Sequence, residues 1–453
     1  MRIIIEGAGE VGSHLAKMLR MEANDVTVID NDEQRLSHLS SYADVETVLG
    51  NPSSIQILKR AGAQKADLYI AVYPFATQEV NIVGALLAKK LGTERVIARI
   101  NDEDFLTPEN RLLFKEMGIE LMFYPEKIAA DEIIDALKHS ATSETMDFAQ
   151  GKLKVAVLKL DDDTPCTDKN LKEFTDMIDP DDLKNFRIIA IARDSKTIIP
   201  RFDTKFHYGD LVYTISTKEG LPALIHYFGK ANIEVGGVMI LGGTAIGEMV
   251  ARNLSGQIGS IKIIDDNRER CIELSEKLPD DVVIVNGDGR NSDFLFEESI
   301  NEYDAFVAVT PNDEANILSC VIAKKLGVQK TIAEVENIEY LRLAEEMGVD
   351  TVINKKLITA SRIFKFTLSD KARSVRYMNG TDAEVIEYTV APGSAITKAP
   401  LKDLSFLKNA IIGGVVRGGE SFIAVGETKI EPYDRVAIFA LPETIKDIDK
   451  FFK

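Results

Sequence analysis

Most of this chain's sequence occurs twice, and that repeat constrains the fold more than any other feature. MRIIIEGAGEVGSHLAKML at 1–19 and VMILGGTAIGEMVARNL at 238–254 both run from apolar residues through closely spaced glycines into a helical pattern. Further matched pairs are 71–100 with 308–335, which share the block AKKLG, and 114–133 with 344–363. A repeat of this length predicts two structural halves, each able to form a core of its own.

Each half begins with apolar strands that alternate with helical segments. In the first half the predicted elements are a strand at 2–6, a helix at 11–20, a strand at 26–30, a helix at 31–42 and, after further alternation, a strand at 95–100. Strands and helices that alternate along a chain form a parallel, doubly wound sheet. We therefore expect an α/β fold with two Rossmann-like parallel-sheet domains.

The pattern then changes to short β-branched strands joined by turn-rich loops. KLKVAVLKL at 152–160 and FRIIAIAR at 186–193 are examples in the first half, and IIGGVVR at 411–417 is one in the second. We expect a small α/β domain after each Rossmann-like domain. The predicted domains are 1–125, 140–229, 235–357 and 370–453.

Charge and apolar content exclude several classes of partner. The formal net charge is −18, and such a surface repels a phosphate backbone, so we expect no nucleic-acid partner. No segment approaches the roughly 18–20 apolar residues that span a bilayer, and the start lacks a leader pattern. We expect a cytoplasmic protein with no direct membrane insertion. The 3 cysteines have neither disulfide nor metal-site spacing, so we expect no metal.

The sequence Gly7-Ala8-Gly9-Glu10-Val11-Gly12 directly follows a predicted strand and opens a predicted helix. This placement makes the G-x-G-x-x-G spacing informative. The first glycine permits a tight turn, the second lets the backbone approach a pyrophosphate, and the third lets the helix pack closely on the sheet. The helix start supplies N–H donors for phosphates. A tight turn without a ligand is the alternative.

Asp30 ends the next predicted strand, VTVID. Its distance from the glycines is that at which a carboxylate meets the ribose 2′-hydroxyl of an adenine nucleotide. A 2′-phosphate there would face a like charge. Asp30 therefore favours NAD over NADP.

Arg99 lies at the end of a later predicted strand, in VIARI, at the carboxyl edge of the sheet, where such folds bind ligands. One interpretation is a cation for the nucleotide phosphates. The other is a surface arginine paired with Asp102 or Glu103. The sequence leaves both open.

The second half differs at the corresponding positions. In Gly242-Gly243-Thr244-Ala245-Ile246-Gly247, Thr244 stands where the first half has Gly9, and its branched side chain obstructs close backbone access. Glu334 replaces Arg99 and repels phosphate. We expect the first half to bind nucleotide strongly and the second weakly or not at all, although Asp265 is retained.

These motifs resemble the TrkA family, the peripheral NAD-binding subunits of the Trk potassium-uptake system, which contain tandem RCK (also called KTN) domains. The resemblance spans essentially the whole chain. Its marks are GAGEVG at 7–12 with Asp30, AVTPNDEAN at 308–316, the AKKLG blocks, and IIAIARDSKTIIPRFDTKFHYGDLVYTI at 188–215. Tyr73-Pro74 with a two-residue insertion replaces the usual Thr-x-x-Asp-Glu, which is a departure from the family.

The resemblance implies a regulatory role and no catalysis. The subunit would bind NAD(H), ATP or ADP and gate a TrkH-type integral membrane potassium transporter subunit. It would form a homo-oligomeric ring, a tetramer or dimer of dimers, held at the inner face of the membrane by its protein partner. The nucleotide contacts carried over are Gly7, Ala8, Gly9, Glu10, Val11, Asp30, Tyr73, Pro74 and Arg99, with weaker counterparts at Gly242, Gly243, Thr244, Ala245, Ile246, Asp265, Thr310, Pro311 and Glu334.

An NAD-dependent oxidoreductase with duplicated Rossmann halves is the alternative function. Such an enzyme needs an acid or base beside the nicotinamide. The 5 histidines do not repeat between the halves and form no catalytic spacing. The sequence therefore favours a protein that is not an enzyme.

Overall fold

The computed structural model describes residues 1–21, 24–73, 78–138, 142, 144–149, 151–161, 163–193, 196–230, 234–364, 372–377, 383–404, 409–441 and 444–452. The chain divides into two compact units. One comprises Met1–Asp131 with Asn354–Thr367, and the other comprises Glu132–Ile353 with Leu368–Lys453.

The first unit contains a six-stranded parallel sheet of order β3-β2-β1-β4-β5-β6. Its strands are β1 (Arg2–Glu6), β2 (Asp25–Asp30), β3 (Glu46–Leu49), β4 (Leu68–Ala71), β5 (Arg95–Arg99) and β6 (Leu121–Phe123). Its helices include α1 (Glu10–Met21), α2 (Glu33–Tyr42), α3 (Ile55–Arg60), α4 (Gln78–Leu91) and α5 (Pro108–Met117). The strand order reverses between β1 and β4, which is where doubly wound sheets bind ligands.

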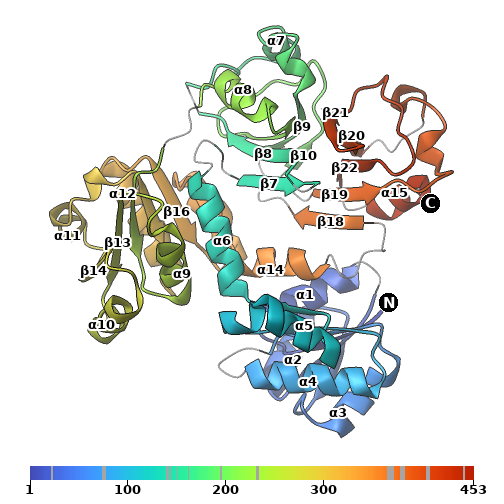
Figure 1. Ribbon diagram of the computed structural model, residues 1–453, viewed down its shortest axis with the longest axis vertical. Coiled ribbons are helices and arrows are strands. Elements are labelled where there is room, and N and C mark those ends of the chain that lie inside the picture. The colour runs from blue at the N-terminus through green and yellow to red at the C-terminus, as the bar shows by residue number, and fades with distance from the viewer. Residues whose placement is uncertain are drawn as a thin grey trace. The chain divides into compact units, whose positions relative to one another are not determined.

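The first unit also contains a helix from the second repeat. Helix α14 (Lys355–Phe364) follows the last strand of the second parallel sheet in the chain, yet it packs on α1 (Figure 1). Helix α6 (Pro125–Lys138), its counterpart in the first repeat, begins in the first unit and ends in the second. Each repeat thus contributes a helix that leaves its own sheet.

The second unit contains a parallel sheet with the same topology, β14-β13-β12-β15-β16-β17. Its strands are β12 (Gly237–Leu241), β13 (Ser260–Asp265), β14 (Val282–Asn286), β15 (Ala305–Ala308), β16 (Lys330–Glu334) and β17 (Thr351–Ile353). Its helices include α9 (Ala245–Leu254), α10 (Arg268–Lys277), α11 (Ser292–Glu297), α12 (Asp313–Lys325) and α13 (Ile338–Glu346). The predicted fold class, two Rossmann-like halves with small α/β additions, is confirmed.

Two five-stranded antiparallel sheets complete the second unit, and they also share one topology. The first comprises β7 (Glu144–Phe148), β8 (Leu153–Lys159), β9 (Phe186–Arg193), β10 (Lys196–Ile198) and β11 (Leu211–Thr217), with helices α7 (Leu171–Thr175) and α8 (Gly220–Tyr227). The second comprises β18 (Ala372–Tyr377), β19 (Glu384–Thr389), β20 (Ala410–Arg417), β21 (Glu420–Ile423) and β22 (Arg435–Ala440), with helix α15 (Ile445–Phe452).

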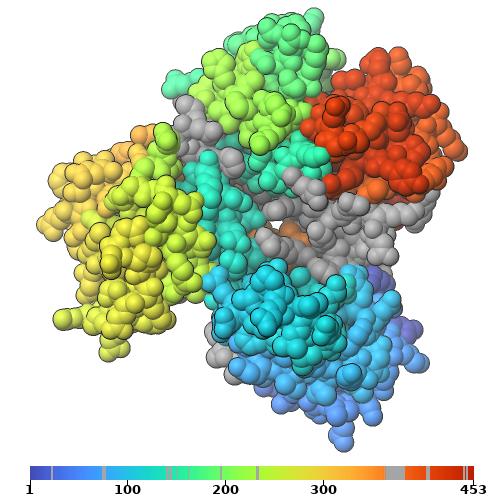
Figure 2. Space-filling model, in the orientation of Figure 1, coloured from blue at the N-terminus to red at the C-terminus, as the bar shows by residue number. Residues whose placement is uncertain are grey.

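The two small sheets pack on each other through one hydrophobic core, which includes Leu153 and Ile215 from the first and Phe439 from the second. Figure 2 shows their green and red surfaces in contact. A Cβ on Gly413 would lie 2.9 Å from the Ile215 side chain, so this glycine permits the close approach. The four-domain division remains a proposal, and its starts at residues 140 and 370 lie outside the described residues.

None of the helices in the described ranges combines the length and the apolar character that crossing a membrane requires.

Candidate nucleotide-binding site

The turn after β1 requires glycine at two positions. Gly7 has a φ of +105°, and its N–H donates to the Ile29 carbonyl at 2.8 Å. A Cβ on Gly7 would lie 2.6 Å from the Tyr73 Cα, and one on Gly12 would lie 1.9 Å from the Gly7 carbonyl oxygen. The turn therefore brings strand and helix closer together than any side chain allows.

Asp30 holds this turn in place. Its Oδ2 accepts the Ala8 N–H at 2.6 Å and its Oδ1 accepts the Asp32 N–H at 2.9 Å, and the residue is fully buried. The sequence predicts Asp30 as a ribose ligand, and the structure gives it a second role that sequence analysis missed. Each carboxylate oxygen has two lone pairs, so both retain capacity for a hydroxyl donor.

The start of α1 offers backbone donors without a side-chain cap. Gly9 precedes the helix and has no side chain, Glu10 begins it with its side chain exposed, and Val11 follows half-buried. The N–H groups of a first helical turn have no partner within the helix. This helix start therefore suits the phosphates of a nucleotide.

A buried asparagine fixes the loop after β4. Oδ1 of Asn81, on α4, accepts the Tyr73 N–H at 2.8 Å, and the Tyr73 hydroxyl reaches Asn31 after β2. Tyr73 thus extends across the end of β1. Pro74 lies outside the described residues. Sequence analysis missed Asn81, although it matches the last residue of AVTPNDEAN at 308–316.

Arg99 ends β5 and pairs with Glu126, the second residue of α6, at 3.1 Å. Neither of the acidic neighbours weighed from the sequence is its partner. Asp102 accepts the Asp104 N–H, and Glu103 pairs with Lys127 at 3.0 Å. Arg99 therefore lies at the carboxyl ends of the strands, and its side chain is 21% exposed.

The second turn has the same backbone. Gly242 has a φ of +108° and donates to the Ile264 carbonyl at 2.8 Å. Asp265 accepts the Gly243 N–H at 2.7 Å and the Asn267 N–H at 2.8 Å. The aspartate thus makes the same two backbone hydrogen bonds in both halves.

Thr244 occupies the start of α9. Its hydroxyl accepts the Gly247 N–H at 3.4 Å and donates to the Val309 carbonyl at 3.0 Å. The residues that follow it, Ala245 and Ile246, belong to the helix, and Ile246 is buried. A donor that would face a phosphate is therefore satisfied within the chain.

Arg270 closes the second turn from the α10 side. Its Nε donates to the Gly243 carbonyl at 2.6 Å, and its Nη2 pairs with Glu248 at 2.7 Å. The matching residue in the first half, Arg35, pairs with Asp32 at 3.4 Å. Arg270 therefore spans the second turn, whereas Arg35 pairs within its own helix start and does not cover the first turn.

Two of the other weaker counterparts, Thr310 and Glu334, form hydrogen bonds with Asn316, which matches Asn81 of the first half. Its Oδ1 accepts the Thr310 N–H at 2.9 Å, and its Nδ2 donates to the Glu334 carbonyl at 2.9 Å. Glu334 is buried, and Pro311 is exposed. A buried carboxyl group stands where the first half has Arg99.

A buried carboxyl group lies directly beneath the first turn. Glu6 ends β1 with no exposure, and its Oε2 accepts the Tyr69 hydroxyl at 2.8 Å. Burial raises the pKa of Glu6 well above its usual value, and the Tyr69 hydrogen bond offsets only part of this rise. The second half has Leu241 and Phe306 at these positions. Sequence analysis missed Glu6, although a charged residue in an apolar strand was a signal.

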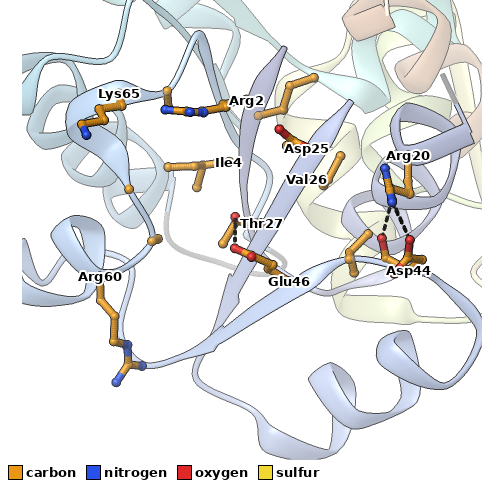
Figure 3. Close-up of a pocket in the computed structure, with 15 residues that line it drawn as sticks. Arg2, Ile4, Arg20, Asp25, Val26, Thr27, Asp44, Glu46, Arg60 and Lys65 are labelled. Atoms are coloured by element: carbon orange, nitrogen blue, oxygen red, sulfur yellow. Dashed lines mark hydrogen bonds and ion pairs between the residues drawn. The ribbon is translucent and has the colours of Figure 1, made fainter. Parts of the chain in front are cut away.

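A pocket of about 600 Å³ lies at the amino ends of the strands of the first sheet, opposite the glycine turn (Figure 3). Arg2, Asp25 and Glu46, which begin β1, β2 and β3, line it. None of the predicted nucleotide contacts lines it. Both acidic and basic side chains surround this pocket, and it is separate from the glycine turn.

Comparisons with known proteins agree with the repeat. The TrkA-N domain family matches residues 3–125 and again 238–355, and the TrkA-C domain family matches residues 385–453. The chain is 34% identical over 455 residues to a Trk system potassium uptake protein TrkA homolog of Archaeoglobus fulgidus, covering all of both chains. It is 31% identical over 458 residues to the Trk system potassium uptake protein TrkA of Azorhizobium caulinodans, covering 100% of this chain and 99% of that protein.

Solved structures share the fold. The RCK domain of GsuK superposes with a TM-score of 0.61 at 18% identity, covering 100% of this chain and 94% of that one. The GsuK channel bound to NAD gives a TM-score of 0.60 at 18% identity, covering 100% of this chain and 78% of that one. At this identity the likeness establishes the arrangement of the elements.

Proposed function

Because the chain belongs to the TrkA family of the Trk potassium uptake system, we propose that it is a nucleotide-binding regulatory subunit that gates a TrkH-type potassium-conducting membrane protein. The subunit performs no catalysis. It is held at the cytoplasmic face of the membrane by that partner.

The geometry of the first turn carries this proposal. Gly7 and Gly12 leave no room for a Cβ, Gly9 precedes a helix start without a side-chain cap, and Asp30 fixes the loop. These residues fit a pyrophosphate bound to backbone N–H groups and a ribose beside the carboxylate. NAD(H), ATP and ADP share these parts, and GsuK, which has the same fold, has been solved bound to NAD and to ADP.

Gating is a shift between two arrangements of an oligomeric ring built from several copies of the chain. A nucleotide shifts this equilibrium only if it binds one arrangement more tightly than the other. The first-half cleft is the effective site, and the second-half cleft binds weakly or not at all, because Thr244 and Arg270 occupy its turn.

Two measurements on the full chain test the proposal. Calorimetry with NADH, ATP and ADP should show binding that a change in the first turn removes. Co-purification with a TrkH-type membrane subunit, followed by potassium flux in vesicles, should show nucleotide-dependent transport. Absence of nucleotide binding contradicts the sensing role, and binding without association or altered flux contradicts the gating role.

A further inference from the structure

Two lysines of the second repeat lie beside the start of α1, the helix that follows the first glycine turn. Lys355 and Lys356 are the first residues of α14, which packs on α1 within the first unit. Lys356 forms an ion pair with Glu10, the first residue of α1. The start of α14 is therefore held beside the helix start that the turn presents to phosphate.

Lys355 lies beside Arg99. The Lys355 Nζ is 3.6 Å, and the Arg99 Nη2 3.1 Å, from the same Oε1 of Glu126. The side chains of Lys355 and Lys356 are only 17% and 11% exposed. Cations this far removed from water require anionic partners. Glu10, beside the turn, and Glu126, beside the end of β5, supply that negative charge.

The charge of Lys356 also reaches His14, on the next turn of α1. Burial lowers the pKa of His14, and the nearby charges of Lys17 and Lys356 lower it further. Its buried Nε2 has no hydrogen-bond partner among the described residues. Burial is the main cause of the lowered pKa of His14, and the positive charges of Lys17 and Lys356 contribute the rest.

The lysine pair occurs in only one of the two repeats. The match of 114–133 with 344–363 places Pro125 and Glu126 at the positions of Lys355 and Lys356. The helix that packs on the first half thus begins with two cations, whereas its counterpart begins with a proline and an acid.

We propose that Lys355 and Lys356 bind the phosphates of the nucleotide held by the first turn, and that Glu10 and Glu126 occupy these lysines when no phosphate is bound. This inference rests on the proposed function. Phosphate oxygens form stronger charge-assisted hydrogen bonds with such donors than neutral groups do. The first cleft is therefore completed by the second repeat, and phosphate binding releases Glu10 and changes the contact between α1 and α14.

Calorimetry of the full chain with ATP, ADP, NADH and adenosine tests the inference. Lys355→Gln and Lys356→Gln should each weaken ATP binding about tenfold or more, the loss of a charged hydrogen bond, and leave adenosine binding unchanged. Lys356→Arg should keep most of the affinity. Glu10→Gln should strengthen ATP binding, because the competing carboxylate is gone.

Lys90→Gln, an exposed change in the last turn of α4, is the matched control and should leave ATP binding unchanged. Thermal unfolding of each variant checks that it folds. If the wild type binds no nucleotide, the proposed function fails. If it binds and the glutamine variants bind ATP equally well, or lose adenosine and ATP equally, the inference alone is overturned. If Lys355→Gln and Lys356→Gln do not fold, an unchanged or weaker affinity in Glu10→Gln overturns it.

Discussion

The two glycine turns have nearly the same backbone and different surroundings. Gly7 and Gly242 have φ values of +105° and +108°, and an aspartate at the end of the next strand accepts a backbone N–H from each turn. The first turn opens on a helix start preceded by Gly9. The second is filled by the Thr244 hydroxyl and spanned by Arg270.

The comparison distinguishes residues that stabilise the turn from residues that allow it to bind a nucleotide. Asp265 is retained in a half whose turn is closed, and its two backbone hydrogen bonds supply a reason that needs no ligand. A retained aspartate is therefore weak support for a nucleotide site. Access to the helix start and the sign of the nearby charges distinguish the halves.

The largest expected effect comes from the third glycine of each motif. A Cβ in Gly12→Ala would lie 1.9 Å from a backbone oxygen, and one in Gly247→Ala would lie 2.2 Å from its counterpart. Both changes should cost about 3 kcal/mol or more. Only Gly12→Ala should abolish nucleotide binding, measured by calorimetry, with hydrogen exchange reporting which half loosens. Loss of binding in Gly247→Ala would break the comparison.

The next effect depends on pH and belongs to the first half alone. The pKa of Glu6 is raised well above 4.5 by burial, so the folded chain keeps a proton that the unfolded chain releases. Stability should therefore fall as pH rises above about 4.5, by about 1.4 kcal/mol per pH unit, until the pH reaches the folded-state pKa. Below about pH 4.5 Glu6 is protonated in both the folded and the unfolded chain, so it no longer makes stability depend on pH.

Glu6→Gln tests this, because glutamine keeps an acceptor for Tyr69 and cannot ionise. The variant should be more stable than the wild type at pH 8 and about equal at pH 4.5, in denaturant unfolding followed across pH. Glu46→Gln, which changes an exposed glutamate on β3, is the control. Parallel pH profiles for wild type and Glu6→Gln would show that the buried carboxyl group is not responsible.

A smaller, matched effect is expected from the two aspartates. Asp30→Asn and Asp265→Asn each weaken two backbone hydrogen bonds to a carboxylate, at a cost of about 1.5–3 kcal/mol. The two losses of stability should be similar. NADH affinity should fall only in Asp30→Asn. Equal affinities in both variants would show that the aspartate serves the turn alone.

Local sequence patterns predicted the large sheets well, because apolar strands and amphipathic helices each have a periodicity that neighbouring residues reveal. The predicted strand at 2–6 matches β1, and that at 186–193 matches β9. The short edge strand β7 was missed, since five residues carry little periodic signal. The core shared by the small sheets joins Leu153 to Phe439, a contact that no local pattern contains.

The candidate site shows the same limit. Glycine spacing indicated the turn, because the glycines that form it lie close together in the sequence. Arg270 and Lys356 act through contacts with segments distant along the chain, so composition and spacing could not identify them. Asn81 was within reach, because the repeat itself aligns it with Asn316.

The smallest expected effect sharpens the comparison most. Thr244→Gly restores the residue found at Gly9 and should change stability by only a few tenths of a kcal/mol, since glycine is tolerated at a helix N-cap. Binding by the second half should nevertheless remain weak, because Arg270 still bonds to the Gly243 carbonyl and the buried Glu334 still stands where the first half has Arg99. Calorimetry of Thr244→Gly in a Gly12→Ala background isolates that half. Tight ATP binding there would mean that one methyl-bearing side chain, and not the surrounding charges, separates the two clefts.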